Sequence, residues 1–348
     1  MEDKYTRIRL IERIMQLDIG ARGIQSVEHE NLCSCTADHL YRAASAIASL
    51  SAGSTIGILT GFYIPHGTPP APESDGPPGA ISLARGLNQL GYKTLLLTDE
   101  YSENVLHRSF DFFKGDLQNT IPVIFPVKNG FLASDEFDAT FIDKFFQRYD
   151  ELSCLISVER VGPSYDLQSL FSQNGNDDSL YKLFSEYGPG NFAGHCLNMK
   201  AESVDRFTAP THLLFDHIYQ NKLPIQTIGI GDGGNEIGMG SIPWHVIQKN
   251  INSGVGGKIA CRIPTDFTVV AGVSNWGALA LLAAITILFD RKSVFLDFIT
   301  EEKETAFLTY LTDHQLVVDG VFGYPNVSVD GIDWDVHLSI LKLIRSVI

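Results

Sequence analysis

The feature that most constrains the fold is a repeated alternation of short β-branched or leucine-rich runs with longer segments of helical periodicity. Strands are expected at residues 54–60, 92–99, 120–127, 153–159, 224–230, 258–263 and 266–272, and helices at 80–90, 101–114, 139–149, 210–220, 242–249 and 276–289. Strands that alternate with helices form βαβ units, which build a parallel sheet covered on both faces. The sequence therefore predicts an α/β fold with a mostly parallel sheet and helices on both faces.

The segments around this alternation predict one large α/β domain over residues 1–348. Residues 1–50 contain two stretches of helical periodicity before the first strand, at 4–18 and 38–50. Residues 160–209 are polar and rich in turn-forming residues, which is typical of a lobe or lid beside the sheet. The apolar run at 277–289 is too short to span a bilayer and long enough for a buried helix.

Charge and cysteine content narrow the class of protein. The chain has 41 acidic and 26 basic side chains, and the difference, 41 − 26, gives a net charge of −15. Nucleic acid and anionic membrane surfaces reward a basic face, so neither is expected as the main partner. Five scattered cysteines and a charged start without an apolar signal segment predict free thiols and a cytoplasmic enzyme. Assembly into a homo-oligomer is left open.

A glycine-rich segment, GIGDGGNEIGMG at residues 229–240, follows a predicted strand and carries the strongest chemical signal. Asp232 and Glu236 are candidate catalytic acids or metal ligands, and Gly233, Gly234 and Asn235 offer donors for an anion. A tight structural turn is the alternative interpretation. Residues 229–234 match G-x-G-x-x-G after a predicted strand. Dinucleotide sites also use an acidic residue at a strand end about 20 residues later, and this sequence has none there. No nucleotide cofactor is therefore expected.

Two further loops place carboxylates after predicted strands, where ligands bind in open α/β sheets. Glu73 and Asp75 lie in a Pro/Gly loop before a helix, where they bind a metal or an ammonium, or only favour the helix start. Glu159 and Arg160 end another strand. Glu159 is a candidate general base and Arg160 a candidate clamp for a carboxylate, with a surface ion pair as the alternative.

Polar residues in two more segments complete the set of candidates. Asn198, Lys200 and Arg206 lie in the turn-rich stretch 194–210, where a purely structural or solvated role is equally compatible with the sequence. Ser274 and Asn275 precede the apolar helix, where they either cap it or present polar groups to a site.

The candidate acids outnumber the nearby cations: Glu73, Asp75, Asp99, Glu159, Asp232 and Glu236. Such a cluster is costly unless protons or a cation neutralise it. Carboxylate oxygens suit a hard divalent cation. The sequence therefore predicts a Mg²⁺ or Mn²⁺ site, with ligands drawn from Glu73, Asp75, Asp232 and Glu236.

Taken together, these segments resemble the D-glutamate cyclase family over roughly residues 20–335. The resemblance is carried by GFYIP (61–65), ESDGPPGA (73–80), ERVG (159–162), NMKAESVDRFTAP (198–210), TIGIGDGGNEIGMG (227–240), AGVSNWGA (271–278) and VDGVFGYPNVSVDG (318–331). NMKA stands where the family pattern has NMRG, so Lys200 replaces an arginine whose bidentate geometry it cannot reproduce.

The resemblance implies a hydro-lyase that converts D-glutamate, a small acidic amino acid, to 5-oxo-D-proline and water. Ring closure needs a base at the amine, an acid at the leaving oxygen and positive charge at the γ-carboxylate. Asp232 or Glu236 is expected to act as the base or as a metal ligand, glycine-loop amides as oxyanion donors, and Arg160 with Arg206 as the clamp for the α-carboxylate. Two other classes stay open: a metal-dependent hydrolase, for example of a phosphate ester, and a non-catalytic protein that binds an acidic amino acid.

Overall fold

The computed structural model describes residues 2–127, 135–175, 177–251 and 254–348. Its centre is a six-stranded sheet in the order β5-β4-β1-β6-β7-β8, and every neighbouring pair is parallel. The strands are β1 (Thr55–Thr60), β4 (Lys93–Asp99), β5 (Thr120–Phe125), β6 (Leu152–Val158), β7 (Gln226–Gly231) and β8 (Phe267–Val270). The predicted α/β class with a parallel sheet is confirmed.

The strand order reverses between β1 and β6. From β1 the chain adds β4 and β5 on one side of the sheet, and then crosses back to add β6, β7 and β8 on the other side. The carboxyl ends of β1 and β6 therefore diverge toward helices on opposite faces, which leaves a crevice at this point of the sheet. The position of a ligand site is fixed by this topology.

The sheet is apolar on both faces because helices cover both. Ile56 and Ile58 of β1 belong to one hydrophobic core, whereas Leu59 belongs to the other. Gly57 lies on the second face, where a Cβ atom would approach the Leu155 side chain to 2.8 Å. A strand that is buried on both faces has a continuous apolar sequence rather than an alternating one. The sequence of β1 shows this continuous pattern.

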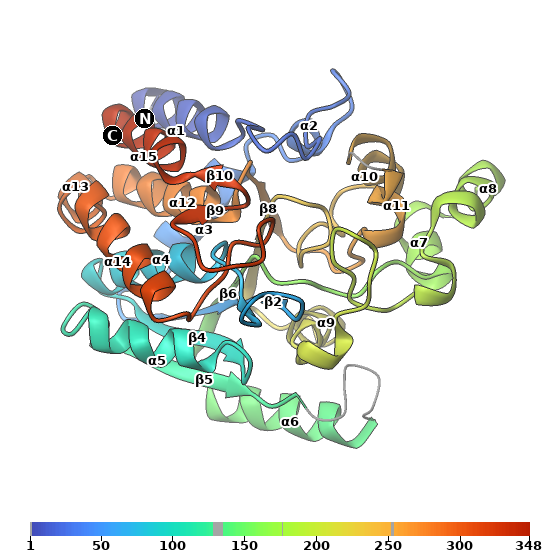
Figure 1. Cartoon of the computed structure of the whole chain (residues 1–348), viewed down its shortest axis with the longest axis horizontal. Helices are drawn as coiled ribbons and strands as arrows, with labels where there is room; N and C mark the ends of the chain where they lie inside the picture. The colour runs from blue at the N-terminus through green and yellow to red at the C-terminus, as the bar shows by residue number, and fades with distance from the viewer. Residues whose placement is uncertain (1, 128–134, 176, 252–253) are drawn as a thin grey trace.

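One face of the sheet is covered by the helices drawn mostly in the left half of Figure 1. They are α1 (Glu2–Met15), α3 (His39–Ala48), α4 (Pro77–Gln89), α5 (Glu103–Phe112), α12 (Ser274–Leu288), α13 (Lys292–Phe298), α14 (Glu301–Asp313) and α15 (Trp334–Val347). The apolar helix α12 lies innermost, with every residue from Ser274 to Ile287 buried. None of the described helices combines the length and the apolar character that crossing a bilayer requires.

The other face packs against a second set of helices. They are α2 (Leu32–Cys35), α6 (Asp135–Arg148), α7 (Leu167–Asn174), α8 (Asp178–Tyr187), α9 (His212–Gln220), α10 (Trp244–Asn250) and α11 (Gly256–Ile259). Two short hairpins complete the described elements: β2 (Tyr63–Ile64) with β3 (Ala71–Pro72), and β9 (Ser328–Val329) with β10 (Ile332–Asp333).

The expected strand at 258–263 is wrong. The short helix α11 ends at Ile259, and the residues beyond it form only isolated bridges, such as Ser164 with Cys261. Ile259, Cys261 and Ile263 are buried, whereas Lys258 is exposed and Arg262 is partly exposed. The run therefore imitates the alternation of a strand, and six residues are too few to separate a strand from other structures. The turn-rich segment 160–209 contains α7, α8 and two 3₁₀ turns, Gly190–Phe192 and Asp205–Phe207. The description of the chain as a single domain stays a prediction.

Candidate active site

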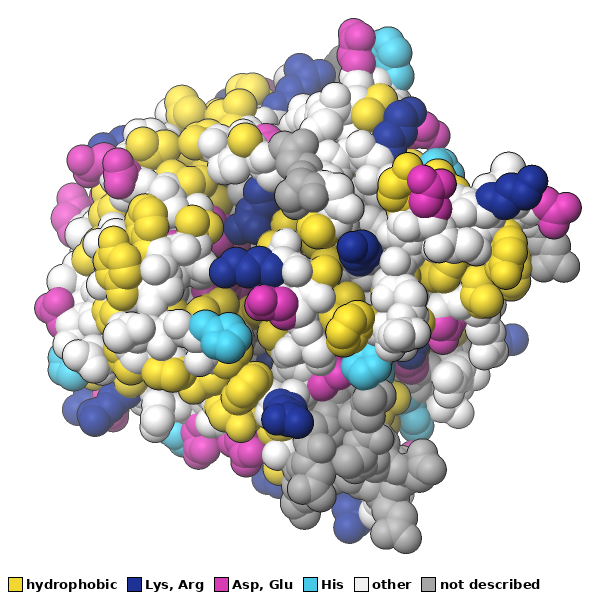
Figure 2. Space-filling model, turned by 45° about the vertical axis from the view of Figure 1, so that its right-hand side comes forward, with side chains coloured by type: hydrophobic (Ala, Val, Ile, Leu, Met, Phe, Trp, Pro, Cys, Tyr) yellow, Lys and Arg dark blue, Asp and Glu magenta, His cyan; other side chains and the backbone are white. Residues whose placement is uncertain are grey.

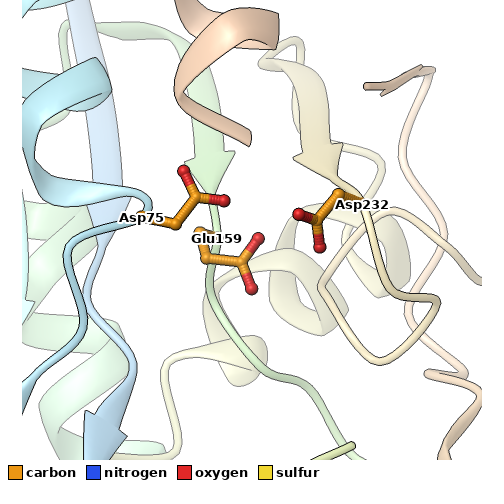
Figure 3. Close-up of side chains that lie close together, drawn as sticks. All are labelled: Asp75, Glu159 and Asp232. Atoms are coloured by element: carbon orange, nitrogen blue, oxygen red, sulfur yellow. The ribbon is translucent and has the colours of Figure 1, made fainter. Parts of the chain in front are cut away.

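Three carboxylates meet where β1, β6 and β7 lead into their loops. Asp75 lies in the loop between β3 and α4, Glu159 follows β6 directly, and Asp232 follows β7 directly. One oxygen from each side chain lies within 4.8 Å of the others. Figure 3 shows the three side chains, which come from separate parts of the chain, around a common space. Parallel neighbouring strands end at the same edge of the sheet, which is why these distant residues converge.

Asp75 is held by the start of α12. Its Oδ2 accepts a hydrogen bond from the Ser274 amide at 2.8 Å, and its Oδ1 accepts from the Asn275 amide at 2.7 Å. Asn275 returns the interaction, because its Oδ1 accepts from the amides of Gly76 and Gly79 at the start of α4. The two helices therefore satisfy each other's N-terminal amides, which have no partner within their own helices.

Glu159 is placed by an unusual backbone conformation. Its φ is +47°, in the left-handed region that non-glycine residues rarely adopt. The neighbouring Gly76 has φ +93°, and a Cβ atom there would lie 2.6 Å from the Glu159 Cβ. The Ser274 hydroxyl donates to Glu159 Oε2 at 2.5 Å. Backbone strain at a buried carboxylate is typical of a functional position.

Asp232 is the least satisfied of the three acids. Its side chain is 1% exposed, and neither carboxylate oxygen has a hydrogen-bond partner among the described residues. The closest opposite charge is the Arg22 guanidinium, whose Nε lies 3.5 Å from Asp232 Oδ2. A buried carboxylate without hydrogen bonds is costly unless a ligand or a cation completes its environment.

Burial raises the pKa of four carboxyl groups in this region well above the ordinary range, and negative neighbours raise them further: Glu73, Asp75, Glu159 and Asp232. Hard oxygen ligands and the orphaned oxygens of Asp232 fit a divalent cation, which would replace the missing counter-charge. The residues present therefore fit the predicted cation, and Asp75, Glu159 and Asp232 surround the place that it would take.

Glu236 occupies a different position from the one expected. Its carboxylate is fully buried and accepts hydrogen bonds from the backbone amides of Asp232, Gly233 and Gly234, at 3.2, 2.6 and 2.8 Å. The Gly233 and Gly234 amides are among the oxyanion donors that the sequence suggested. The glycine loop is therefore folded around its own glutamate, and its geometry supports neither a base role for Glu236 nor a free oxyanion site.

Arg160 is also committed to the scaffold. Its guanidinium is buried and pairs with Asp99 Oδ2 at 2.6 Å. It also donates to the Gly61 and Ala209 carbonyl oxygens and to the Thr211 hydroxyl. A fork with these four partners has little capacity left for a substrate carboxylate. Asp99 is correspondingly engaged here rather than with the three acids.

A pocket of ≈ 250 Å³ opens beside the acids. Its lining includes four acidic residues, two cations and several polar groups, among them Arg22, Glu73, Glu159, Asn198, Lys200, Asn235 and Asp330. Arg206 is exposed and does not line the pocket. In Figure 2, Lys and Arg side chains gather around a hollow in the middle of the face, next to acidic side chains. A small molecule with both charges would fit such a mixed lining.

Residues 11–175 and 186–345 match a protein family described as D-glutamate cyclase-like, C-terminal. A curated human protein, "D-glutamate cyclase, mitochondrial", is 30% identical over 286 residues, which is 81% of this chain. The chain belongs to the D-glutamate cyclase-like family. It spans 39% of the length of the human relative. A solved structure of O-ureido-L-serine synthase with bound O-ureido-L-serine covers 79% of this chain and 86% of its own, at 11% identity and a TM-score of 0.20, too low to carry an argument.

For this member of the D-glutamate cyclase-like family, the sequence pointed to some pocket residues and missed others. Asn198 lines the pocket, and its side chain organises the turn by accepting from the amides of Lys200 and Glu202. Asn235 also lines it and donates to the Leu197 carbonyl oxygen at 2.8 Å. Gly233 leaves room for the Met199 sulfur, which would lie 2.9 Å from a Cβ atom.

Arg22 and Asp330 were missed. Arg22 lies in the loop after α1, and Asp330 in the turn of the β9–β10 hairpin, with φ +56°. An Asp-Gly pair at 330–331 is a turn signal, and although the segment 318–331 carries part of the family resemblance, its local pattern does not single out Asp330 as a site residue. The carboxylates of Asp232 and Asp330 outweigh burial and raise the pKa of Arg22, which keeps it cationic.

Proposed function

We propose that this chain is a D-glutamate cyclase that converts D-glutamate to 5-oxo-D-proline and water. The observation that carries the proposal is the cluster of Asp75, Glu159 and Asp232 beside a pocket of mixed charge. Membership of the D-glutamate cyclase-like family supports it. The reaction joins the amine nitrogen to the γ-carboxyl carbon and releases one carboxyl oxygen as water, so two protons pass from nitrogen to oxygen.

Glu159 is our candidate for the base. It lines the pocket, and the Ser274 hydroxyl occupies only its Oε2, which leaves Oε1 for the substrate amine. Burial raises the pKa of Glu159, which makes its carboxylate a stronger proton acceptor. A base with an ordinary carboxyl pKa would be a weaker proton acceptor.

Glu73 is our candidate for the acid at the leaving oxygen. The structure places it in the pocket lining but outside the group of three acids, which favours this role over the predicted one as a cation ligand. Burial and the nearby Asp330 and Asp75 raise the pKa of Glu73, which favours its protonated form.

Asp75 and Asp232 would hold a Mg²⁺ or Mn²⁺ ion next to Glu159, the third acid of the cluster. When bound, such an ion supplies positive charge that polarises a carboxyl oxygen. The acids are held in fixed orientations: the Ser274 and Asn275 amides at the start of α12 orient Asp75, and the left-handed backbone conformation orients Glu159. Holding amine and carboxyl together in one pocket replaces an encounter in solution and lowers the barrier without an activating nucleotide.

The test is to incubate the protein with D- and L-glutamate, with and without Mg²⁺ or Mn²⁺, and to separate any 5-oxoproline by chiral chromatography. We expect 5-oxo-D-proline from D-glutamate, and a loss of at least about 100-fold in kcat for Glu159→Gln, the range for removing a positioned proton carrier. Glu28→Gln is the matched control, because the Glu28 side chain is 87% exposed.

Two results would replace this proposal by another. Phosphate release from a generic ester, without any 5-oxoproline, would favour a metal-dependent hydrolase that uses the same acids. Saturable D-glutamate binding with thermal stabilisation and no product would favour a binding protein.

A further inference from the structure

We propose that Arg22 and Asp330 together bind the amino-acid head group of the substrate, with the α-carboxylate on the Arg22 guanidinium and the ammonium on Asp330. The identity of the ligand as glutamate rests on the proposed function, whereas the recognition of a zwitterionic head group does not. The inference starts from one ion pair, in which Arg22 Nη2 lies 2.7 Å from Asp330 Oδ1.

Arg22 is fixed in place by the loop that carries it. The Asp18 carboxylate accepts hydrogen bonds from the amides of Arg22, Gly23 and Ile24, which fold the loop into a compact turn. The start of this loop is tied to the rest of the molecule, since the Gly272 amide donates to the Met15 carbonyl oxygen at 2.8 Å. The guanidinium is thus held in position before any ligand arrives, which reduces the entropic cost of binding.

The Arg22 fork retains donors for a ligand. Nε lies 3.5 Å from Asp232 Oδ2 and Nη2 lies 2.7 Å from Asp330 Oδ1, whereas Nη1 donates no hydrogen bond to the described residues. The side chain is 17% exposed and lines the pocket. A planar guanidinium with free N–H groups matches a carboxylate. Lys200, the other pocket cation, is exposed, and Arg160 is already fully engaged.

Asp330 supplies the opposite charge. It is 8% exposed and lines the pocket, and its Oδ1 is paired with Arg22. Its other oxygen, Oδ2, is buried and has no hydrogen-bond partner among the described residues. A buried, unpartnered carboxylate oxygen at the wall of a pocket calls for a donor from a ligand, and an ammonium provides one.

The combination is specific for a head group that carries both charges. A carboxylate alone would satisfy Arg22 and leave Asp330 Oδ2 unpaired, and an amine alone would do the reverse. An α-amino acid has both groups on one carbon, so it can bridge the pair. Anchoring the head group here directs the side-chain carboxyl of the substrate toward the rest of the pocket, where Glu73, the candidate acid, lies.

The test compares two ligands and four variants of the chain. Glutarate has the two carboxylates of glutamate and lacks the amine. We measure KM for D-glutamate by product formation, and Kd for glutarate by calorimetry, in Arg22→Met, Arg22→Lys, Asp330→Asn and the control Arg108→Met, whose side chain is 55% exposed and lies outside the pocket. Melting temperatures are recorded for each protein.

Arg22→Met should weaken both ligands, by about 10- to 100-fold, the range for losing a charged hydrogen-bonding partner. Asp330→Asn should raise the KM for D-glutamate by a similar factor and leave glutarate binding within about 2-fold of wild type. Arg108→Met should change neither. Arg22→Lys should recover part of the affinity, since it restores the charge without the fork.

The inference is overturned if Asp330→Asn weakens the binding of glutarate as much as that of D-glutamate and also lowers the melting temperature. The Arg22–Asp330 ion pair would then only stabilise the fold. It is also overturned if both variants keep the wild-type KM. If the wild-type chain makes no 5-oxoproline, the proposed function fails, and calorimetry with D-glutamate and glutarate still tests the head-group site.

Discussion

Replacement of Glu236 by glutamine separates a structural role from a catalytic one. The Glu236 carboxylate accepts three backbone amides of the glycine loop, two at Oε1 and one at Oε2. A glutamine side chain of the same shape keeps one oxygen and turns the other acceptor into an N–H donor. If its oxygen stays on the Asp232 and Gly233 amides, the Gly234 amide faces a donor and loses its partner.

The expected loss of stability follows from this geometry. A hydrogen bond to a charged group contributes about 1.5–3 kcal/mol, and a buried donor left unsatisfied costs about 1–3 kcal/mol. We therefore expect Glu236→Gln to lower the free energy of unfolding by about 2–4 kcal/mol. Glu236→Ala should lose more, because all three amides lose their acceptor and the side chain leaves a cavity.

Urea unfolding, followed by fluorescence and by circular dichroism, measures the effect, with Glu28→Gln as the exposed control. Activity should fall in Glu236→Gln through a disordered loop, and stabilisation of the fold by a low concentration of osmolyte should restore part of it. A variant that unfolds at the wild-type urea concentration but has no turnover would refute this reasoning and return Glu236 to the role of base.

Three further outcomes are expected. Asp232→Asn should abolish the rise in melting temperature that Mn²⁺ gives the wild type, because it removes one of the carboxylates that would hold the cation; equal Mn²⁺ stabilisation of both proteins would contradict the cation site. Burial lowers the pKa of His337 to about 3, so protonation below about pH 6.5 favours the unfolded chain. Between pH 7.5 and pH 5, the free energy of unfolding measured in urea should fall by about 2 kcal/mol more in the wild type than in His337→Gln. Equal falls in the two proteins would contradict this. Gly272→Ala should lower the free energy of unfolding by about 1–3 kcal/mol and raise the KM for D-glutamate, because the added Cβ would lie 2.0 Å from the Leu17 carbonyl oxygen, in the loop that carries Arg22. Gly20→Ala is the control, since its added Cβ would have no atom closer than 3.8 Å. A wild-type KM in Gly272→Ala would contradict the effect of this loop on substrate binding.

The sequence alone determined the sheet and the places where its strands end. Strand and helix periodicities are local properties, and parallel strands present their carboxyl ends at one edge, so Asp75, Glu159 and Asp232 could be assigned to a common site before their distances were known. The same local signals failed at 258–263, where Ile259, Cys261 and Ile263 are buried at alternate positions, as in a strand, although the segment forms a short helix and isolated bridges.

Only the tertiary structure decided which charges face the pocket. Arg160 follows a strand beside Glu159, yet its partners Asp99 and Ala209 come from other segments and occupy it fully. Arg22 and Asp330 meet from opposite ends of the chain, through a loop and a hairpin turn. The type and spacing of residues show what a charged side chain is able to bind, whereas its partner depends on packing between distant segments, which no local pattern records.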